Sequence, residues 1–256
     1  MIHESPVLSN VEGHVLVLTL NRPHVRNAVN AAMAAAVSRM LDEFEANEDL
    51  RVAVITGAQG TFCSGMDLRA FAAGESPRVA NDGFMGLTNR RVTKPLVAAV
   101  EGAAMGGGFE VALACDLLVC ASSARFGLSE VKRGLAATGG GLLRLPRRIA
   151  WNLAMEIALT GEPIDGARAG EIGLANRVSE PGQALSAAVE LAGMVASNAP
   201  LAVAASKEIL YAQQDWPRDE AFDRQEPWAQ RLKASEDARE GARAFVEKRR
   251  PVWRGR

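Results

Sequence analysis

The stretch PLVAAVEGAAMGGGFEVALACDLLVCA, residues 95–121, places three consecutive glycines between two short apolar runs. The runs at residues 95–100 and 117–121 have the length and the Val and Leu content of buried strands. The glycines, residues 106–108, stand where the first strand would turn into the apolar helix that follows. This order predicts a strand, a tight turn, a helix and a second strand. It also places Glu110 in small and apolar surroundings directly behind the turn.

The same alternation is found on the N-terminal side of this stretch. Residues 15–20 (VLVLTL) and 52–56 (VAVIT) have the composition of further buried strands. Between them, residues 27–47 carry apolar side chains on one face of a helix. Strands that alternate with helices indicate an α/β fold.

The sequence changes character after Gly182, where successive segments have helical spacing and no strand is expected between them. We therefore expect a core domain over residues 1–198 and a helical C-terminal region over residues 199–256. Pro200 is the expected hinge between the two.

The composition narrows the possible partners. With 29 basic and 30 acidic residues, the net charge of −1 does not favour a nucleic-acid or anionic membrane surface. Cys63, Cys115 and Cys120 lack CxxC spacing and nearby histidines, which argues against a zinc site or a disulfide framework and fits a reducing compartment. The N-terminus has no signal pattern, and no apolar run reaches the ~18 residues of a membrane helix. We expect a cytoplasmic protein with no nucleic-acid or membrane partner.

Acid/base chemistry in the middle of this chain has few candidate residues. All three histidines lie within the first 24 residues, so proton transfer elsewhere falls to Asp, Glu, Lys or Cys. Glu110 and Glu130 are the glutamates in small or apolar settings. Each also has a simpler interpretation. Glu110 alone fits a first-turn glutamate stabilised by the helix dipole, and Glu130 fits a solvated charge beside Lys132 and Arg133.

The glycine turn suggests an anion-binding site. Residues 106–108 precede a helix whose first N–H groups are unpaired, and without side chains an oxyanion can approach these donors closely. A tight turn with close packing would use the same residues. The turn is not a dinucleotide fingerprint, because GGGFE lacks the G-x-G-x-x-G spacing.

A second turn of small residues follows the strand at residues 52–56. Ser64, Gly65 and Met66 precede Asp67 and an apparent helix, so this turn is a candidate for the other backbone donor of an oxyanion pair. A nucleophilic role for Ser64 is disfavoured, since FCSGM is not G-x-S-x-G and no downstream histidine exists to activate the hydroxyl. The same objection applies to Cys63.

Together these segments resemble the enoyl-CoA hydratase/isomerase (crotonase) family, and the resemblance runs almost from end to end. The matching segments are NRPHVRNAVN, GTFCSGMDL, KPLVAAVEGAAMGGGFEVALACDLLVCA, ARFGLSEVKRGLAATGGGLLRLPRRI, ALTGEPIDGARAGEIGLANRV and EGARAFVEKRRPVW. The resemblance implies that Met66 and Gly107 supply the backbone N–H groups that hold a thioester carbonyl oxygen. It also implies that Glu110 and Glu130, which match the family pair in motif and spacing, are catalytic.

The resemblance further implies a spiral of ββα units, a helical C-terminal region that supports a homotrimer or a dimer of trimers, and a coenzyme A site. Arg26 and Ala28 would contact the nucleotide end, the turn from Ser64 to Leu68 the pantetheine and thioester, and Lys248 the phosphates, from a neighbouring subunit. The full set of expected substrate contacts is Arg26, Ala28, Ser64, Gly65, Asp67, Leu68, Gly106, Thr138 and Lys248. Read from the sequence alone, the basic residues in this set are equally consistent with solvated surface charges.

Two positions depart from the pattern of many family hydratases. Met66 stands where they have alanine, and Thr138 stands where they have glycine. Neither change removes a backbone donor, but both should reshape the acyl pocket and the water site.

The expected activity is reversible addition of water to the α,β double bond of an enoyl-CoA thioester. Glu110 would act as the base and Glu130 as the acid, because two neighbouring carboxyl groups do not ionise together easily. We expect no metal and no redox cofactor, with coenzyme A entering as part of the substrate. An enoyl-CoA isomerase, a non-catalytic acyl-CoA-binding protein and a hydrolase that uses Ser64 are the alternatives.

Overall fold

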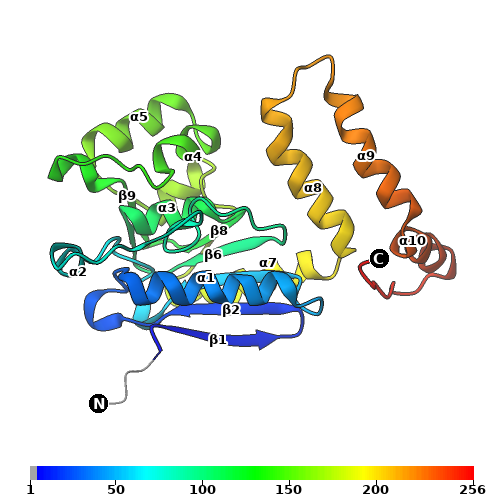
Figure 1. The fold of residues 1–256 in the computed structure, drawn as a ribbon, viewed down its shortest axis with the longest axis horizontal. Helices are drawn as coiled ribbons and strands as arrows, with labels where there is room; N and C mark the ends of the chain where they lie inside the picture. The colour runs from blue at the N-terminus through cyan, green and yellow to red at the C-terminus, as the bar shows by residue number, and fades with distance from the viewer. Residues whose placement is uncertain (1–4) are drawn as a thin grey trace.

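A computed structural model of the chain describes residues 5–256, and its centre is a six-stranded sheet (Figure 1). The strand order is β1-β2-β3-β6-β8-β11, with β1 and β2 antiparallel and every later neighbouring pair parallel. The strands are β1 Val7–Glu12, β2 Val15–Leu20, β3 Val52–Gly57, β6 Leu96–Val100, β8 Leu117–Ala121 and β11 Arg177–Ser179. The four buried strands expected from the sequence are confirmed as β2, β3, β6 and β8.

Both faces of this sheet are covered, which explains why its central strands are continuously apolar. On one face Val15, Val17, Val52, Val54 and Val97 pack against the small side chains of α7 (Ala184–Ala196). The other face meets α1 (Ala31–Ala46) and α3 (Gly107–Ala114) in the larger core.

The helix expected over residues 27–47 begins later, at Ala31. The side chain of Asn30 accepts a hydrogen bond from the Met33 amide at 3.1 Å and caps the helix. Arg26 and Asn27 adopt left-handed backbone conformations, with φ of 54° and 56°, so the preceding residues form a turn.

A second, smaller sheet runs beside the first and has the order β10-β9-β7. Its strands are β7 Ala103–Met105, β9 Arg125–Gly127 and β10 Ile164–Asp165, and β7 and β9 follow β6 and β8 almost directly. The chain thus repeats a strand, a second strand and a helical segment, which agrees with the expected spiral of ββα units. The remaining elements are β4 Arg78–Val79, β5 Gly83–Phe84, α2 Leu68–Ala72, α4 Gly141–Arg148, α5 Trp151–Thr160 and α6 Gly166–Glu171, with 3-10 turns at Pro23–Val25, Ala58–Gly60, Ser129–Arg133 and Gln213–Asp215.

The C-terminal helices α8 (Pro200–Ala212), α9 (Ala221–Ala234) and α10 (Glu236–Glu247) extend away from the sheet (Figure 1). Pro200 occupies the first turn of α8, and α7 and α8 meet at 106°. Of the helical segments expected after Gly182, the first is α7, which covers the sheet, and only the later ones, α8, α9 and α10, project. Within residues 5–256 no single helix has the length and apolar character to span a membrane, although the bent pair α7 and α8 meets those criteria together.

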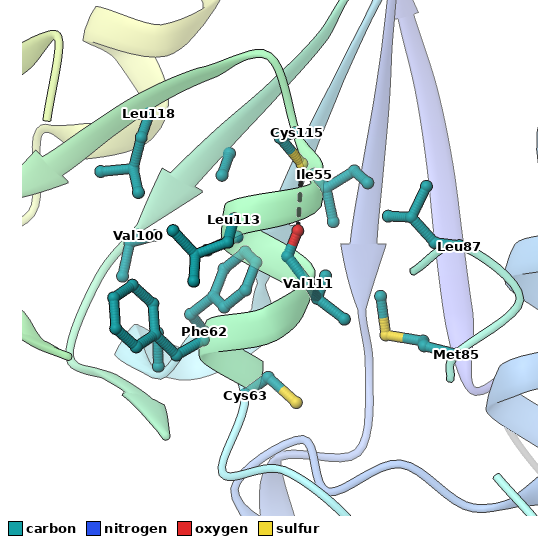
Figure 2. Close-up of a cluster of buried hydrophobic side chains, with 14 of the residues drawn as sticks. Ile55, Phe62, Cys63, Met85, Leu87, Val100, Val111, Leu113, Cys115 and Leu118 are labelled. Carbon is teal, nitrogen blue, oxygen red and sulfur yellow. Dashed lines mark hydrogen bonds between the residues drawn. The ribbon is translucent and has the colours of Figure 1, made fainter. Parts of the chain in front are cut away.

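Helix α3 is fixed in place by apolar side chains from several elements, as Figure 2 shows. Val111 and Leu113 on α3 lie among side chains from β3 and the turn after it, from β6 and β8, and from the 84–88 segment. The neighbours labelled in the figure are Ile55, Phe62, Cys63, Met85, Leu87, Val100, Cys115 and Leu118. Fully burying such a side chain stabilises the fold by roughly 1.5–3 kcal/mol. The rigid cluster therefore sets the position of the N-terminal turn of α3.

Candidate active site

Two turns leave the large sheet at the same edge. Strands β3 and β6 are parallel neighbours, so the segments that follow them emerge side by side. After β3 the Cys63 amide donates to Ala103 O at 2.9 Å, and the Met105 amide donates to Cys63 O at 3.0 Å. The two sequence motifs with small residues are thus joined by hydrogen bonds between their backbones.

The turn that leads from β6 and β7 into α3 ends at Gly106, which has a φ of 54°. Its amide donates to Gly127 O at 2.8 Å, and its carbonyl accepts from the Glu110 amide at 3.0 Å. Among the described residues, the Gly107 amide donates to no acceptor. It is an unpaired donor at a helix N-terminus, as expected for an anion-binding position.

The other turn, which follows β3, contains Met66. The Val29 amide donates to Gly65 O at 2.8 Å, and the Asp67 amide donates to Val29 O at 3.0 Å, so Val29 pairs with the residues on either side of Met66. This pattern directs the Met66 N–H away from Val29. A β-carbon placed on Gly65 would lie 3.3 Å from the Gly107 amide nitrogen, so the two candidate donors sit on touching segments.

Glu110 is buried on the first turn of α3, with 4% of its surface exposed. Its Oε1 accepts a hydrogen bond from the Gly141 amide at 2.9 Å. A β-carbon on Gly139 would overlap Oε2, so the loop at residues 139–141 packs directly on the carboxylate. Burial raises the pKa of Glu110 and Glu130 raises it further, while the Gly141 and Gly139 amides and Arg144 lower it to a smaller extent.

Glu130 lies in the 3-10 turn after β9, and it faces the same glycine turn. A β-carbon on Gly106 would lie 3.1 Å from Glu130 Oε1. Oε2 is buried and has no hydrogen-bond partner among the described residues. Burial raises the pKa of this carboxyl group as well. A buried oxygen without a partner costs roughly 1–3 kcal/mol, which is typical of a group that is completed by a bound molecule.

The expected contacts at the nucleotide end are brought together in part. The Ser64 amide donates to Arg26 O at 3.1 Å, and the Ser64 hydroxyl donates to Val25 O at 3.3 Å. Ala28 lies next to this pair, and its carbonyl accepts from Arg22 at 2.6 Å. The backbone around Arg26 and the turn at Ser64 therefore form one continuous surface.

Asp67 has a structural role that the sequence did not reveal. It forms an ion pair with Arg22 at 2.9 Å, and it caps α2 by accepting from the Arg69 and Ala70 amides. Burial raises the pKa of Asp67, but these hydrogen bonds outweigh burial and hold the pKa below its ordinary value. Leu68, the first residue of α2, is exposed.

Lys248 lies outside this cluster, whereas Thr138 directly precedes the 139–141 loop that packs on Glu110. Thr138 is exposed and lines a cleft of about 1020 Å³ between α8 and the core. Lys248 follows α10, at the opposite end of the molecule from α2 (Figure 1). Within one chain, Lys248 is therefore remote from the two carboxylates.

The nucleophile alternative receives no support from the cysteine next to Ser64. Cys63 is fully buried, and burial raises the pKa of its thiol to about 12. In the described part of the chain, no three His, Cys, Asp or Glu side chains gather in a way that would hold a metal ion.

Sequence reasoning missed several residues that shape this site. Asn27 is fully buried, accepts from the Arg22 amide at 2.9 Å, and donates to Ala58 O and Thr61 O. Phe84 packs on the glycine turn, where a β-carbon on Gly107 would lie 2.6 Å from the ring. Asn tolerates the left-handed conformation, which was the one available signal for Asn27. Phe84 carries no local signal, because its contact with Gly107 is long-range.

Comparison with known proteins gives a consistent result over the whole chain. A model of the enoyl-CoA hydratase/isomerase family matches residues 10–256. Among curated relatives, the enoyl-CoA hydratase EchA19 of Mycobacterium tuberculosis is 41% identical, covering 95% of this chain and 94% of its own. The mevalonyl-coenzyme A hydratase sidH of Aspergillus fumigatus is 42% identical, covering 94% and 92%. The carnitinyl-CoA dehydratase of Proteus mirabilis is 41% identical, covering 95% and 96%.

Solved structures show the same relationship. An enoyl-CoA hydratase from M. tuberculosis superposes with a TM-score of 0.97 at 49% identity, covering 99% of this chain and 100% of that one. A carnitinyl-CoA hydratase from Mycobacterium avium superposes with a TM-score of 0.79 at 41% identity, covering 99% and 100%. The spiral fold, the match over residues 10–256 and these relatives lead to one conclusion: this chain belongs to the enoyl-CoA hydratase/isomerase family.

Proposed function

We propose that the protein is an enoyl-CoA hydratase, which adds water reversibly across the α,β double bond of an enoyl-CoA thioester. The observation that carries the proposal is the pair of carboxyl groups at one glycine turn, of which Glu110 is buried and Glu130 half-buried. Both have raised pKa values, and the buried Glu130 Oε2 has no partner among the described residues. A base and an acid that act on one substrate require pKa values near the working pH and environments that differ from each other.

In the proposed reaction the thioester carbonyl oxygen sits between the Met66 and Gly107 amides. Attack at the β-carbon moves negative charge onto that oxygen, and two aligned N–H donors stabilise the charge. The support is that the Gly107 amide is unpaired and that the Met66 turn touches it. Because hydration is redox-neutral and the proposed donors are protein groups, the reaction as written uses no metal or redox cofactor.

In this proposal one carboxyl group acts as the base and the other as the acid. Glu110 accepts a proton from water while the hydroxide adds to the β-carbon, and Glu130 gives its proton to the α-carbon. Glu110 suits the charged role because the Gly141 amide donates to it, whereas Glu130 Oε2 lacks such a donor. Proton exchange with solvent then restores both groups. The pair titrates as a unit, so this assignment describes the dominant state of the coupled pair.

A panel of thioesters tests the proposed function. The names of the relatives cover enoyl, mevalonyl and carnitinyl groups, so the panel should contain straight, branched and hydroxylated 2-enoyl-CoA compounds. We expect loss of the conjugated thioester absorbance with at least one of them. A shifted double bond would support the isomerase, release of free CoA the hydrolase, and binding without reaction the non-catalytic acyl-CoA-binding protein.

We also propose that the chain forms a homotrimer or a dimer of trimers, with Lys248 reaching the coenzyme site of a neighbouring subunit. The support is the exposed apolar surface on the C-terminal helices, where Phe222 is 79% exposed and Phe245 85% exposed. Light scattering should report a trimer or hexamer, and Phe245→Asp should shift it towards smaller species. A wild-type monomer at micromolar concentration would contradict the proposed trimer or hexamer and would leave the hydratase proposal unaffected.

A further inference from the structure

The loop under Glu110 is itself held by a half-buried cation, Arg144. Residues 139–141 lead into α4, whose first residue is Gly141, and Arg144 lies one turn further along that helix. A β-carbon on Gly140 would overlap Arg144 Nη1, so the guanidinium rests against the backbone of the loop. The Gly141 amide next to it donates to Glu110 Oε1 at 2.9 Å. Arg144 is therefore packed behind the groups that bind the carboxylate.

The other end of the guanidinium reaches a different segment. Arg144 Nη2 donates to Thr88 O at 2.7 Å. The Thr88 hydroxyl in turn accepts from the Phe84 amide at 3.0 Å. The Phe84 ring packs on Gly107, whose amide is a proposed oxyanion donor. A continuous series of contacts thus runs from the loop under Glu110, through Arg144 and Thr88, to the packing partner of Gly107.

The titratable groups that face Glu110 and Arg144 can be named individually. Glu110 faces Glu130, which raises its pKa, and Arg144, which lowers it. Arg144 faces Tyr211 on α8, Arg148 on its own helix, and Cys115. Burial lowers the pKa of Arg144 from its ordinary value, but a guanidinium stays protonated at neutral pH. Arg144 is therefore a permanent positive charge placed behind the proposed base.

We propose that Arg144 is a positioning residue. It holds the 139–141 loop that binds Glu110, favours the charged form of that carboxylate, and ties the loop to the segment that packs on Gly107. The inference rests on the proposed function for its role in catalysis. Its structural part, the effect of Arg144 on Glu110, does not depend on which thioester the enzyme uses.

Three variants separate this role from simple packing. Arg144→Met removes the charge and the hydrogen bond to Thr88 O while keeping an unbranched apolar stem in place of the arginine methylenes. Arg144→Lys keeps the charge but loses the planar guanidinium. The matched control is Arg147→Met on the same helix, since Arg147 is exposed and forms no hydrogen bond or ion pair with any described residue. Thermal unfolding establishes which variants are folded.

The readout is the pH dependence of kcat/KM together with a direct titration of Glu110. Losing the positive charge raises the pKa of Glu110, and the base must be ionised, so the acid limb should move to higher pH in Arg144→Met. We expect kcat/KM of that variant to fall about 10-fold or more at neutral pH, as misplaced catalytic groups do. Arg144→Lys should keep the acid limb of the wild type with a smaller fall, and Arg147→Met should match the wild type.

¹³C NMR of protein with labelled glutamate carboxyl groups gives the second measurement. The Glu110 signal is identified by its loss in Glu110→Gln, and in Arg144→Met its titration should move to higher pH. A folded Arg144→Met variant with unchanged titration would overturn the inference, as would an Arg144→Lys variant shifted as far as Arg144→Met. If the wild type hydrates no thioester and the titration still shifts, the proposed function fails while the placement of Arg144 stands.

Discussion

Glu110 and Glu130 are the same residue type in two different settings. Glu110 has an amide donor at 2.9 Å and a glycine loop packed against it, so its charge has a partner inside the protein. Glu130 has a buried oxygen that no described residue satisfies. Burial raises the pKa of both groups, and the difference between their hydrogen-bond partners explains how one can act as a base and the other as an acid.

Replacing either carboxylate by its amide tests this division. Glu110→Gln and Glu130→Gln should each lower kcat by ~10²-fold or more, because a positioned acid or base contributes about that much. Affinity for acyl-CoA, measured by calorimetry, should stay close to the wild-type value. If either variant hydrates the best substrate at nearly the wild-type rate, two-carboxylate catalysis is wrong.

The raised pKa of Glu130 also predicts how stability depends on pH. The unfolded chain ionises near its ordinary pKa, while the folded state resists ionisation, so the wild type loses stability as pH rises from that value to the folded pKa. Glu130→Gln lacks this loss. Urea unfolding should show similar stabilities of the two proteins at pH 4 and a more stable Glu130→Gln variant at neutral pH. A difference that does not grow with pH would contradict the raised pKa.

Met66 is proposed to act through its backbone, so its side chain should be replaceable. Met66→Ala should keep hydration and alter chain-length preference, since the donor remains and the pocket volume changes. Met66→Pro deletes the N–H, and losing an oxyanion donor costs about 10² to 10³ in rate. The comparison is kcat/KM across several acyl lengths, for variants that still bind CoA. An inactive Ala variant, or a well-folded Pro variant with an unchanged rate, would remove Met66 from the oxyanion hole.

At the scale of elements, the site depends on how closely α3 approaches the turn after β3. The two are in contact at Gly108, where a β-carbon would overlap Cys63 O. Cys63 O also accepts from the Met105 amide at 3.0 Å, so the same carbonyl joins the turn to the strand that leads into α3. The third glycine of the motif is therefore required for packing, in addition to any role in binding an anion.

Gly108→Ala and Gly193→Ala form a matched pair of helix substitutions. At Gly108 the added methyl forces α3 away from Cys63, and we expect a loss of stability of about 1–3 kcal/mol together with a large fall in kcat/KM. At Gly193, in α7, a β-carbon would meet nothing within 4 Å, so alanine should stabilise the protein by up to about 1 kcal/mol. Equal effects of the two changes on urea unfolding would contradict the proposed contact.

The sequence was informative wherever the signal is local. The apolar runs identified β2, β3, β6 and β8, and the fold implied by the family resemblance is confirmed. The series of contacts through Arg144, Thr88 and Phe84 had no signal, because the contacts from Arg144 to Thr88 and from Phe84 to Gly107 join segments that are far apart in the chain. The start of α1 was placed too early, since the apolar pattern continues through a turn in which Arg26 and Asn27 are left-handed, and the helix begins only at Ala31.

At the scale of the whole molecule, the parallel sheet gathers both turns at one edge, and the second sheet and α4 bring Glu130 and the loop under Glu110 against them. The C-terminal helices carry neither of the two carboxyl groups and leave large apolar side chains exposed. Exposed apolar side chains of this size are the observation behind the proposed contacts between copies.

Isotope labelling tests the central claim, that this arrangement adds water to an enoyl thioester, most directly. The protein is incubated in H₂¹⁸O with the best 2-enoyl-CoA of the panel, and the products are analysed by mass spectrometry, with the Glu110→Gln/Glu130→Gln double variant as control. We predict a 3-hydroxyacyl-CoA that carries ¹⁸O on the β-carbon, formed by the wild type and not by the double variant. Label in the carboxylate of a free acid, an unlabelled enoyl-CoA with a moved double bond, or unchanged thioester would contradict the claim.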